Sequence, residues 1–486
     1  MSELSSLSPQ PLWDIFAKIC SIPHPSYHEE ALASYIVARV RERGLHAERD
    51  ATGNILIKKP ATPGFGQCQT VALQAHLDMV PQKNNDTVHD FTRNPIRPRI
   101  EGEWIKASGT TLGADNGIGL ASTLAVLEDN DIQHGPLEVL LTMTEETGMV
   151  GAFGLMPGWL SADILINTDS EEEGEVYVGC AGGIDVTTTL PIVREPTTGN
   201  HLAVRITLKG LKGGHSGCDI HLGLGNANKL LARFLYREQQ SVPFRVSEFS
   251  GGTLRNAIPR EVSTTLLLAE GNLNAFLVDL EQFQRLLQSE LGLPEKNIQL
   301  VSDSVPTPDT MLTAASQQQF LALLNSMPNG VIRNSDAMPG VVETSLNVGI
   351  VNLEEKNATI RCLVRSLADS GKESVVEMLR ALGDLSGAST EAKGSYPGWQ
   401  PDPHSTAMTL VQQTYQQLFG HEPHVQVIHA GLECGLFKKP YPQMDMVSIG
   451  PTITGPHSPD EQVNIASVER YWQLLTALLK AIPEKR

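Results

Sequence analysis

Short apolar runs alternate with amphipathic stretches along the first part of the chain. Four compact apolar segments predict buried strands: residues 54–57, 71–77, 137–143 and 163–167. Residues 28–43 and 118–127 have apolar side chains at helical spacing, and Ser26 with Glu29 predicts a capping box before the first of these helices. This alternation predicts an α/β sheet with helices on both faces.

The pattern changes after residue 184. Residues 185–395 predict an inserted α+β domain with strands at 202–208, 262–268, 345–351 and 358–364 and helices at 275–291, 317–326 and 374–382. Two similar α+β subdomains are compatible with this order, although the sequence has no strong repeat. Residues 393–399 are expected to link back to the first domain. Its sheet would be completed by a helix at 406–419, strands at 425–428 and 446–449, and a helix at 467–481.

The expected architecture is therefore an α/β catalytic domain formed by residues 1–184 and 396–486, with an α+β lid domain inserted at 185–395. A chain of 486 residues is long enough for two such domains. The net charge of −18, spread along the chain, argues against a nucleic-acid partner. We expect a cytoplasmic protein without a membrane segment, because no signal peptide and no apolar run of about 20 residues is present.

Cysteine usage narrows the chemistry of any metal site. The six cysteines are scattered singly with no C-x-x-C pair, which favours reduced thiols over disulfides or a thiolate zinc site. Any bound metal should therefore be held by His, Asp and Glu.

Five short segments end strand-like or glycine-rich stretches in a carboxylate or an imidazole. They are Ala75-His76-Leu77-Asp78, Gly113-Ala114-Asp115-Asn116-Gly117, Thr144-Glu145-Glu146, Asn167-Thr168-Asp169-Ser170 and Gly455-Pro456-His457-Ser458. In α/β sheets, ligands bind at the carboxyl ends of the strands, where several of these residues fall. Two imidazoles with three carboxylates suit a pair of divalent ions of zinc type, with cobalt or manganese as alternatives. Paired metals generate hydroxide and polarise a carbonyl, so the pattern predicts hydrolysis.

Each segment has a simpler explanation when it is considered alone. Asp115 could cap a helix, Glu145 and Glu146 could form a solvated acidic loop, and His457 could lie on the surface. Residues 171–173 are expected to be an exposed acidic turn. Four other histidines are expected to be surface or packing residues: His24, His89, His134 and His404.

Taken together, the segments resemble the M20 family of dinuclear metallopeptidases over nearly the whole chain. The motifs that carry the resemblance are the five segments above and Gly213-Gly214-His215-Ser216-Gly217. The string Ile428-His429-Ala430-Gly431-Leu432-Glu433-Cys434 is similar to a subgroup that hydrolyses dipeptides.

The resemblance implies a role for each metal-centre residue. Asp115 would bridge two zinc ions, with two further ligands on each: His76 and Asp169 on one, Glu146 and His457 on the other. Asp78 would orient His76. Glu145 would take the proton from the bridging water and pass it to the leaving amine.

Four residues outside the metal set are implied to contact the substrate. His215 resembles a lid histidine that stabilises the oxyanion, and Asn256 resembles a polar contact in a substrate-binding turn. Arg365 would hold the terminal carboxylate, and Glu433 would meet the free α-amine. From the residues alone, His215 would be a turn residue and Arg365 a solvated arginine, and Glu433 could equally be a helix N-terminal carboxylate.

The expected function is hydrolysis of unblocked dipeptides, including those with C-terminal histidine, by a homodimeric enzyme with two zinc ions per subunit. The alternatives are an N-acyl amino acid amidohydrolase or tripeptidase of the same family, and a metal-binding protein without catalysis.

Overall fold

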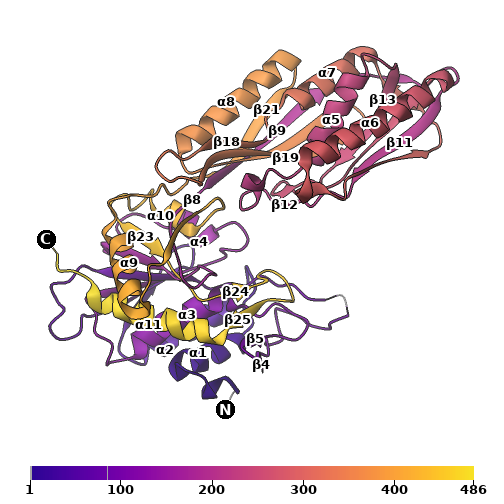
Figure 1. The fold of residues 1–486 in the computed structure, drawn as a ribbon. Coiled ribbons are helices and arrows are strands. Elements are labelled where there is room, and N and C mark those ends of the chain that lie inside the picture. The colour runs from indigo at the N-terminus through magenta and orange to yellow at the C-terminus, as the bar shows by residue number, and fades with distance from the viewer. Residues whose placement is uncertain (1–2, 85, 486) are drawn as a thin grey trace. The chain divides into compact units, whose positions relative to one another are not determined.

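The computed structural model describes residues 3–84 and 86–485, and the chain divides into two compact units. Unit 1 consists of Met1–Gly179, Trp399–Val427 and Leu432–Arg486, and unit 2 of Cys180–Gly398 and Ile428–Gly431 (Figure 1). The segment Ile428–Gly431 lay within the predicted catalytic domain. It belongs to unit 2 because the N–H of Ala181 donates to the carbonyl of Ile428 at 3.0 Å and His429 Nε2 lies 2.8 Å from Ser345 Oγ.

Unit 1 is built on an eight-stranded mixed sheet with the order β1-β2-β6-β3-β7-β23-β8-β22. The strands are β1 His46–Arg49, β2 Ile55–Lys59, β3 Val71–His76, β6 Leu137–Thr142, β7 Ile164–Asn167, β8 Glu175–Cys180, β22 His424–Ile428 and β23 Asp445–Ser448. Strands β6, β3, β7 and β23 run parallel, whereas β1 and β2 pair antiparallel. The predicted α/β class is confirmed, and two C-terminal strands complete the sheet as expected.

Helices cover this sheet because its strands are apolar on both faces. Ile164 and Ile166 of β7 join the core formed with the large helices, and Leu165 between them is also fully buried and points the other way. The helices of unit 1 are α1 Gln10–Cys20, α2 Glu30–Arg41, α3 Ala114–Glu128, α4 Val150–Gly154, α9 Thr406–Phe419, α10 Glu433–Phe437 and α11 Ile465–Ala481. A small antiparallel sheet adds β4 Arg99–Glu101, β5 Trp104–Lys106, β24 Ile453–Thr454 and β25 Gln462–Asn464.

The predicted capping box at α2 is wrong. The N-cap residue Glu29 has helical dihedral angles and makes no side-chain cap bond. Ser26 Oγ instead donates to Asp78 Oδ2 at 2.7 Å, and Glu29 Oε1 accepts from the backbone N–H (2.8 Å) and hydroxyl (2.6 Å) of Thr144. Both side chains therefore bond to segments that follow β3 and β6, where buried polar groups need partners.

Unit 2 is built on a large antiparallel sheet with the order β16-β11-β15-β13-β19-β20-β9-β21, and β18 pairs with β19. The strands are β9 Gly182–Pro191, β11 Leu202–Lys209, β13 Phe244–Gly251, β15 Val262–Leu268, β16 Gln299–Ser304, β18 Gly330–Asn334, β19 Val342–Leu353, β20 Asn357–Ser366 and β21 Ser389–Tyr396. Both halves of the insertion contribute to this sheet, because β13 pairs with β19 at Gly251 and Val351. Residues 393–396 of the predicted linker are strand, since β21 continues to pair with β9.

Four helices pack on unit 2's sheet: α5 Ala227–Glu238, α6 Leu273–Leu291, α7 Ala314–Ser326 and α8 Asp369–Ser386 (Figure 1). Val204, Ile206 and Leu208 alternate along β11 toward this core, and the intervening Arg205 and Thr207 face away from it. In the part of the chain that the structure describes, no helix combines the length and apolar character needed to cross a membrane.

The aromatic contact between α7 and β13 provides a test of this core. Phe320 is fully buried, with its ring centroid 5.4 Å from that of Phe249. Phe320→Ala should destabilise unit 2 by about 3–5 kcal/mol, because the deletion leaves a cavity. Denaturant unfolding would measure the loss, and Gln319→Ala on the exposed side of α7 is the matched control. Equal stability of the two variants would contradict this packing.

Candidate functional site

The structure brings all five predicted metal ligands together in unit 1. His76 ends β3, Glu146 and Asp169 follow β6 and β7, Asp115 lies at the start of α3, and His457 lies in the loop between β24 and β25. Asp115 is central to the group. Its Oδ1 lies 3.1 Å from His76 Nε2 and its Oδ2 lies 3.2 Å from His457 Nε2.

The remaining carboxylates extend this arrangement on each side of Asp115. His76 Nε2 is 3.3 Å from Asp169 Oδ1, and His457 Nε2 is 3.0 Å from Glu146 Oε2. The residues on the two sides of Asp115 are close to each other, because ligand atoms of His76, Asp115 and Glu146 all lie within 4.8 Å of one another. Nitrogen and oxygen donors without a thiolate suit a divalent ion of zinc type. Among the described residues, the buried Oε1 of Glu146 has no hydrogen-bond partner, which also fits a metal ligand.

Burial and crowding of negative charge raise the pKa values of several of these carboxyl groups. The pKa of Glu145 lies well above its ordinary value, because of burial and the nearby charges of Asp169 and Glu146. Burial and the charge of Asp115 raise the pKa of Glu146 to about 7. Burial, together with Asp115, raises the pKa of Asp169 to about 6, although His76 opposes the shift. The site is thus an acidic cluster that a bound cation would stabilise.

Asp78 supports the site in two ways. His76 Nδ1 lies 3.0 Å from the backbone carbonyl of Asp78 and 3.4 Å from its carboxylate, so a proton on Nδ1 leaves Nε2 free as a ligand. The same carboxylate accepts the backbone N–H of Glu145 at 2.8 Å and that of Glu146 at 3.2 Å. The sequence argument anticipated only the first contact.

Two further carboxylates at this site were missed from the sequence. Glu461 is 2% exposed and accepts four backbone N–H groups of the Asp115 loop. Glu171 is half-buried, and burial with the charges of Asp115 and Asp169 raises its pKa to about 9. The prediction of an exposed acidic turn at 171–173 therefore holds only for Glu172. Spacing gave no signal for Glu461, because its partners are 346–349 residues away.

In unit 2, a two-stranded sheet holds His215 beside Asn256. The strands β12 Gly214–His215 and β14 Ala257–Ile258 pair with each other. The N–H of Ser216 donates to the carbonyl of Asn256 at 2.8 Å. Two predicted substrate residues are therefore adjacent.

Backbone hydrogen bonds set the tautomer of His215. Its Nδ1 accepts the N–H groups of Gly217 at 3.2 Å and Cys218 at 3.0 Å, so the proton of the neutral ring lies on Nε2. Burial and the positive charge of Arg365 lower the pKa of His215 to about 4. The ring is therefore a neutral hydrogen-bond donor at physiological pH.

Arg365 is buried in unit 2, which excludes the simpler explanation of a solvated strand-end arginine. It is 5% exposed, and its Nη1 donates to Tyr396 Oη at 3.2 Å. Its Nη2 lies 3.4 Å from His215 Nε2, so two donors converge. No carboxylate of residues 3–84 or 86–485 forms an ion pair with this guanidinium. An anionic oxygen is the partner that this pair of donors requires.

Glu433 is buried in unit 1 as the first residue of α10. Its Oε2 accepts from Gln74 Nε2 at 2.6 Å and Thr142 Oγ1 at 2.8 Å, whereas Oε1 has no partner among the residues described. Burial raises the pKa of Glu433 to about 7, with His76 opposing the shift.

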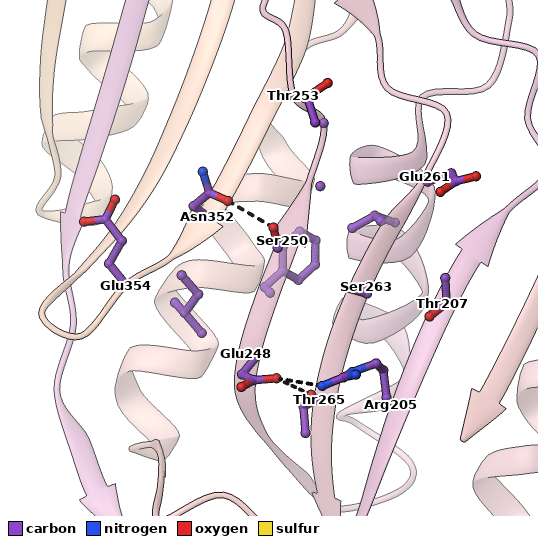
Figure 2. A pocket seen from close by; sticks show the side chains of 15 residues that line it. Arg205, Thr207, Glu248, Ser250, Thr253, Glu261, Ser263, Thr265, Asn352 and Glu354 are labelled. Carbon is purple, nitrogen blue, oxygen red and sulfur yellow. Dashed lines mark hydrogen bonds and ion pairs between the residues drawn. The ribbon is translucent and has the colours of Figure 1, made fainter. Parts of the chain in front are cut away.

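A groove of about 790 Å³ lies on the face of unit 2's sheet that the helices do not cover (Figure 2). Its polar side chains bond to one another: Thr265 Oγ1 donates to Glu248 at 2.6 Å and Ser250 Oγ to Asn352 at 3.2 Å. No imidazole or thiol is among the residues that line it. The groove therefore has carboxylates but lacks the imidazole donors of the acidic cluster.

The chain belongs to the peptidase family M20/M25/M40, whose model matches residues 72–481. It is therefore a peptidase, and the predicted family is confirmed. It is 65% identical over 485 residues, covering 100% of both chains, to a protein of Escherichia coli (strain K12) named cytosol non-specific dipeptidase. Among solved structures, it matches the aminoacylhistidine dipeptidase from Vibrio alginolyticus with a TM-score of 0.93 and 57% identity, covering 100% of this chain and 99% of that one.

A more distant match shows the fold alone. The aminopeptidase PepT from Bacillus cereus aligns with a TM-score of 0.57 at 16% identity, covering 98% of this chain and 99% of that one.

Metal binding should release protons from the metal-free protein. Hydrogen bonds to Asp115 and Glu146 raise the pKa of His457 to about 11, and Asp169 and Asp115 raise that of His76 despite its burial. Both rings are therefore protonated at about pH 7, and a metal must displace those protons. The apparent affinity should rise with pH. Calorimetric titration with Zn²⁺ in two buffers of different ionisation enthalpy would count the released protons. The His457→Gln variant should release fewer protons than the wild type. Binding heats that do not depend on the buffer would contradict the expectation.

Proposed function

We propose that the protein is a cytosolic metallodipeptidase that hydrolyses unblocked dipeptides, including those with histidine at the C-terminal position. The acidic cluster carries this proposal, because Asp115 lies between two imidazoles and Glu145 lies in the same buried group. The full-length similarity to a protein named cytosol non-specific dipeptidase and to an aminoacylhistidine dipeptidase supports the substrate class and the compartment.

Two divalent ions would be held by the five clustered residues, with zinc as the first choice and cobalt or manganese as alternatives. Asp115 would contribute to both ions, because its two oxygens face different imidazoles; His76 and Asp169 would help to hold one ion and Glu146 and His457 the other. When bound, such ions supply Lewis-acid activation of water and polarisation of the scissile carbonyl.

Glu145 is the proposed general base and acid. Its raised pKa suits a group that accepts a proton from the attacking water and then delivers it to the leaving amine. Asp78 accepts the backbone N–H of Glu145 at 2.8 Å, and this hydrogen bond helps to position the Glu145 residue that would carry the proton.

The substrate's charged ends would meet opposite charges of the chain. Arg365 would bind the terminal carboxylate, since it is buried without an ion-pair partner among the described residues. Glu433, with its unpartnered Oε1, would accept the α-ammonium group. His215 Nε2–H would donate to the developing oxyanion, and Asn256 would add a polar contact. The homodimer stays a prediction.

The first test of this function is metal-restored cleavage. Metal-stripped protein should release histidine from Gly-His and β-Ala-His only after Zn²⁺ is added. N-acetyl-Gly-His should resist, because it lacks the α-ammonium group. Glu145→Gln should lose at least about 100-fold in kcat while still binding metal. Cleavage of the acetylated compound would move the function to an amidohydrolase, cleavage of tripeptides instead would indicate a tripeptidase, and full turnover by Glu145→Gln would refute the base assignment.

The role of Arg365 makes a separate prediction. Arg365→Met should cost about 2–5 kcal/mol in kcat/KM for Gly-His, because a buried charge partner of the carboxylate is lost. The same substitution should change kcat/KM for Gly-His amide little, since the amide lacks the carboxylate. Arg361→Met, an exposed position on the same strand, is the matched control. Equal losses for the acid and the amide would exclude carboxylate binding.

A further inference from the structure

We propose that Glu461 is a positioning residue that holds the Asp115 loop in register with the loop that carries His457. The proposal rests on the function proposed above, because it concerns the spacing of two metal ligands. The Glu461 carboxylate bonds to backbone N–H groups, so it is not a catalytic residue. It would act through the backbone of residues 112–115.

One carboxylate accepts the whole row of backbone donors at this loop. Glu461 Oε2 lies 2.7 Å from the nitrogen of Leu112 and 3.0 Å from that of Gly113. Its Oε1 lies 2.8 Å from the nitrogen of Ala114 and 3.1 Å from that of Asp115. Because both oxygens act only as acceptors and the side chain is 2% exposed, an ionised carboxylate fits these four N–H groups.

The Asp115 loop has no side chain of its own for this purpose. The N-cap of α3 is Gly113, with a left-handed φ of 73° and no side-chain cap bond. Asp115 itself has non-helical dihedral angles (φ −81°, ψ 109°). The first N–H groups of a helix lack internal partners, so this turn depends on an acceptor from elsewhere. Glu461 provides that acceptor and also places negative charge at the helix N-terminus.

The other side of Glu461 belongs to the His457 loop. The N–H of Glu461 donates to the carbonyl of Ser458 at 3.1 Å, and His457 has a left-handed φ of 60°. The next residues form β25, which pairs with β5 and β24. Glu461 is thus anchored between a small sheet and the ligand loop. One residue therefore sets the position of His457 relative to Asp115, whose side chains lie 3.2 Å apart.

The chain offers a matched control for a purely structural role. Glu138 is also 2% exposed, and its carboxylate accepts the backbone N–H of Ser161 at 2.9 Å and of Ala162 at 3.1 Å. It supports a turn that carries no predicted metal ligand. Glu138 also lies 3.7 Å from Lys58 Nζ, so Glu138→Gln reports what losing a buried acceptor and an ion pair away from the proposed metal ligands does to stability.

Glu461→Gln keeps the side-chain size but replaces one oxygen by an amide NH₂, which cannot accept the two N–H groups it would face. We expect the metal-free variant to stay folded, with an unfolding midpoint near that of Glu138→Gln. Its Zn²⁺ affinity, measured by chelator competition, should fall about 10–100-fold. kcat for Gly-His at limiting Zn²⁺ should fall with it, and KM should change little. Glu461→Asp retains the charge and should recover part of the affinity.

Each other outcome is decisive. Zn²⁺ affinity in Glu461→Gln equal to that of Glu138→Gln would overturn the positioning role and leave the proposed function intact. Both Glu461 variants could also unfold while Glu138→Gln stays folded. If excess Zn²⁺ does not restore their folding, Glu461 has a structural role and the proposal is overturned. A wild-type chain that binds no divalent ion would instead overturn the proposed function, and this inference with it.

Discussion

Repulsion among partly buried carboxylates is the constraint on which the site in unit 1 depends. Asp115, Glu145, Glu146 and Asp169 converge at the carboxyl end of one sheet, and burial with mutual repulsion raises the pKa values of the last three. Such a cluster is stable only with protons or cations among its members. Imidazoles alone cannot satisfy it, since a buried oxygen of Glu146 lacks a partner among the described residues. The donor chemistry is therefore that of a metal centre.

A second set of carboxylates keeps this cluster in place without joining it. Asp78 accepts the backbone of Glu145 and Glu146, and Glu29 accepts both donors of Thr144, which has a left-handed φ of 52°. Glu461 does the same for the Asp115 loop. Each of these acids accepts at least one main-chain N–H of a ligand loop, so its carboxylate helps to fix the loop geometry. Ligand loops that would repel one another are thereby held at short range.

Unit 2 has the complementary chemistry. Its main chemical feature is a pair of donors, the neutral ring of His215 and the buried guanidinium of Arg365, without a carboxylate partner among the described residues. A dipeptide carries one carboxylate and one ammonium group. The donors of unit 2 suit a carboxylate, and, considered separately, the buried acid Glu433 of unit 1 suits an ammonium group.

Apolar periodicity predicted most strands and helices, because it reports which face of an element is buried, and the residue pattern identified the side chains that cluster around Asp115. The hydrogen-bond partners of these side chains depend on the tertiary fold. The local capping box at Ser26 and Glu29 was wrong because both side chains bond to distant segments. Residues 393–396 of the predicted linker belong to β21 because this strand pairs with β9. Glu461 was invisible for the same reason: its four donors are distant in sequence, and spacing along a chain carries no information about contacts made only after folding.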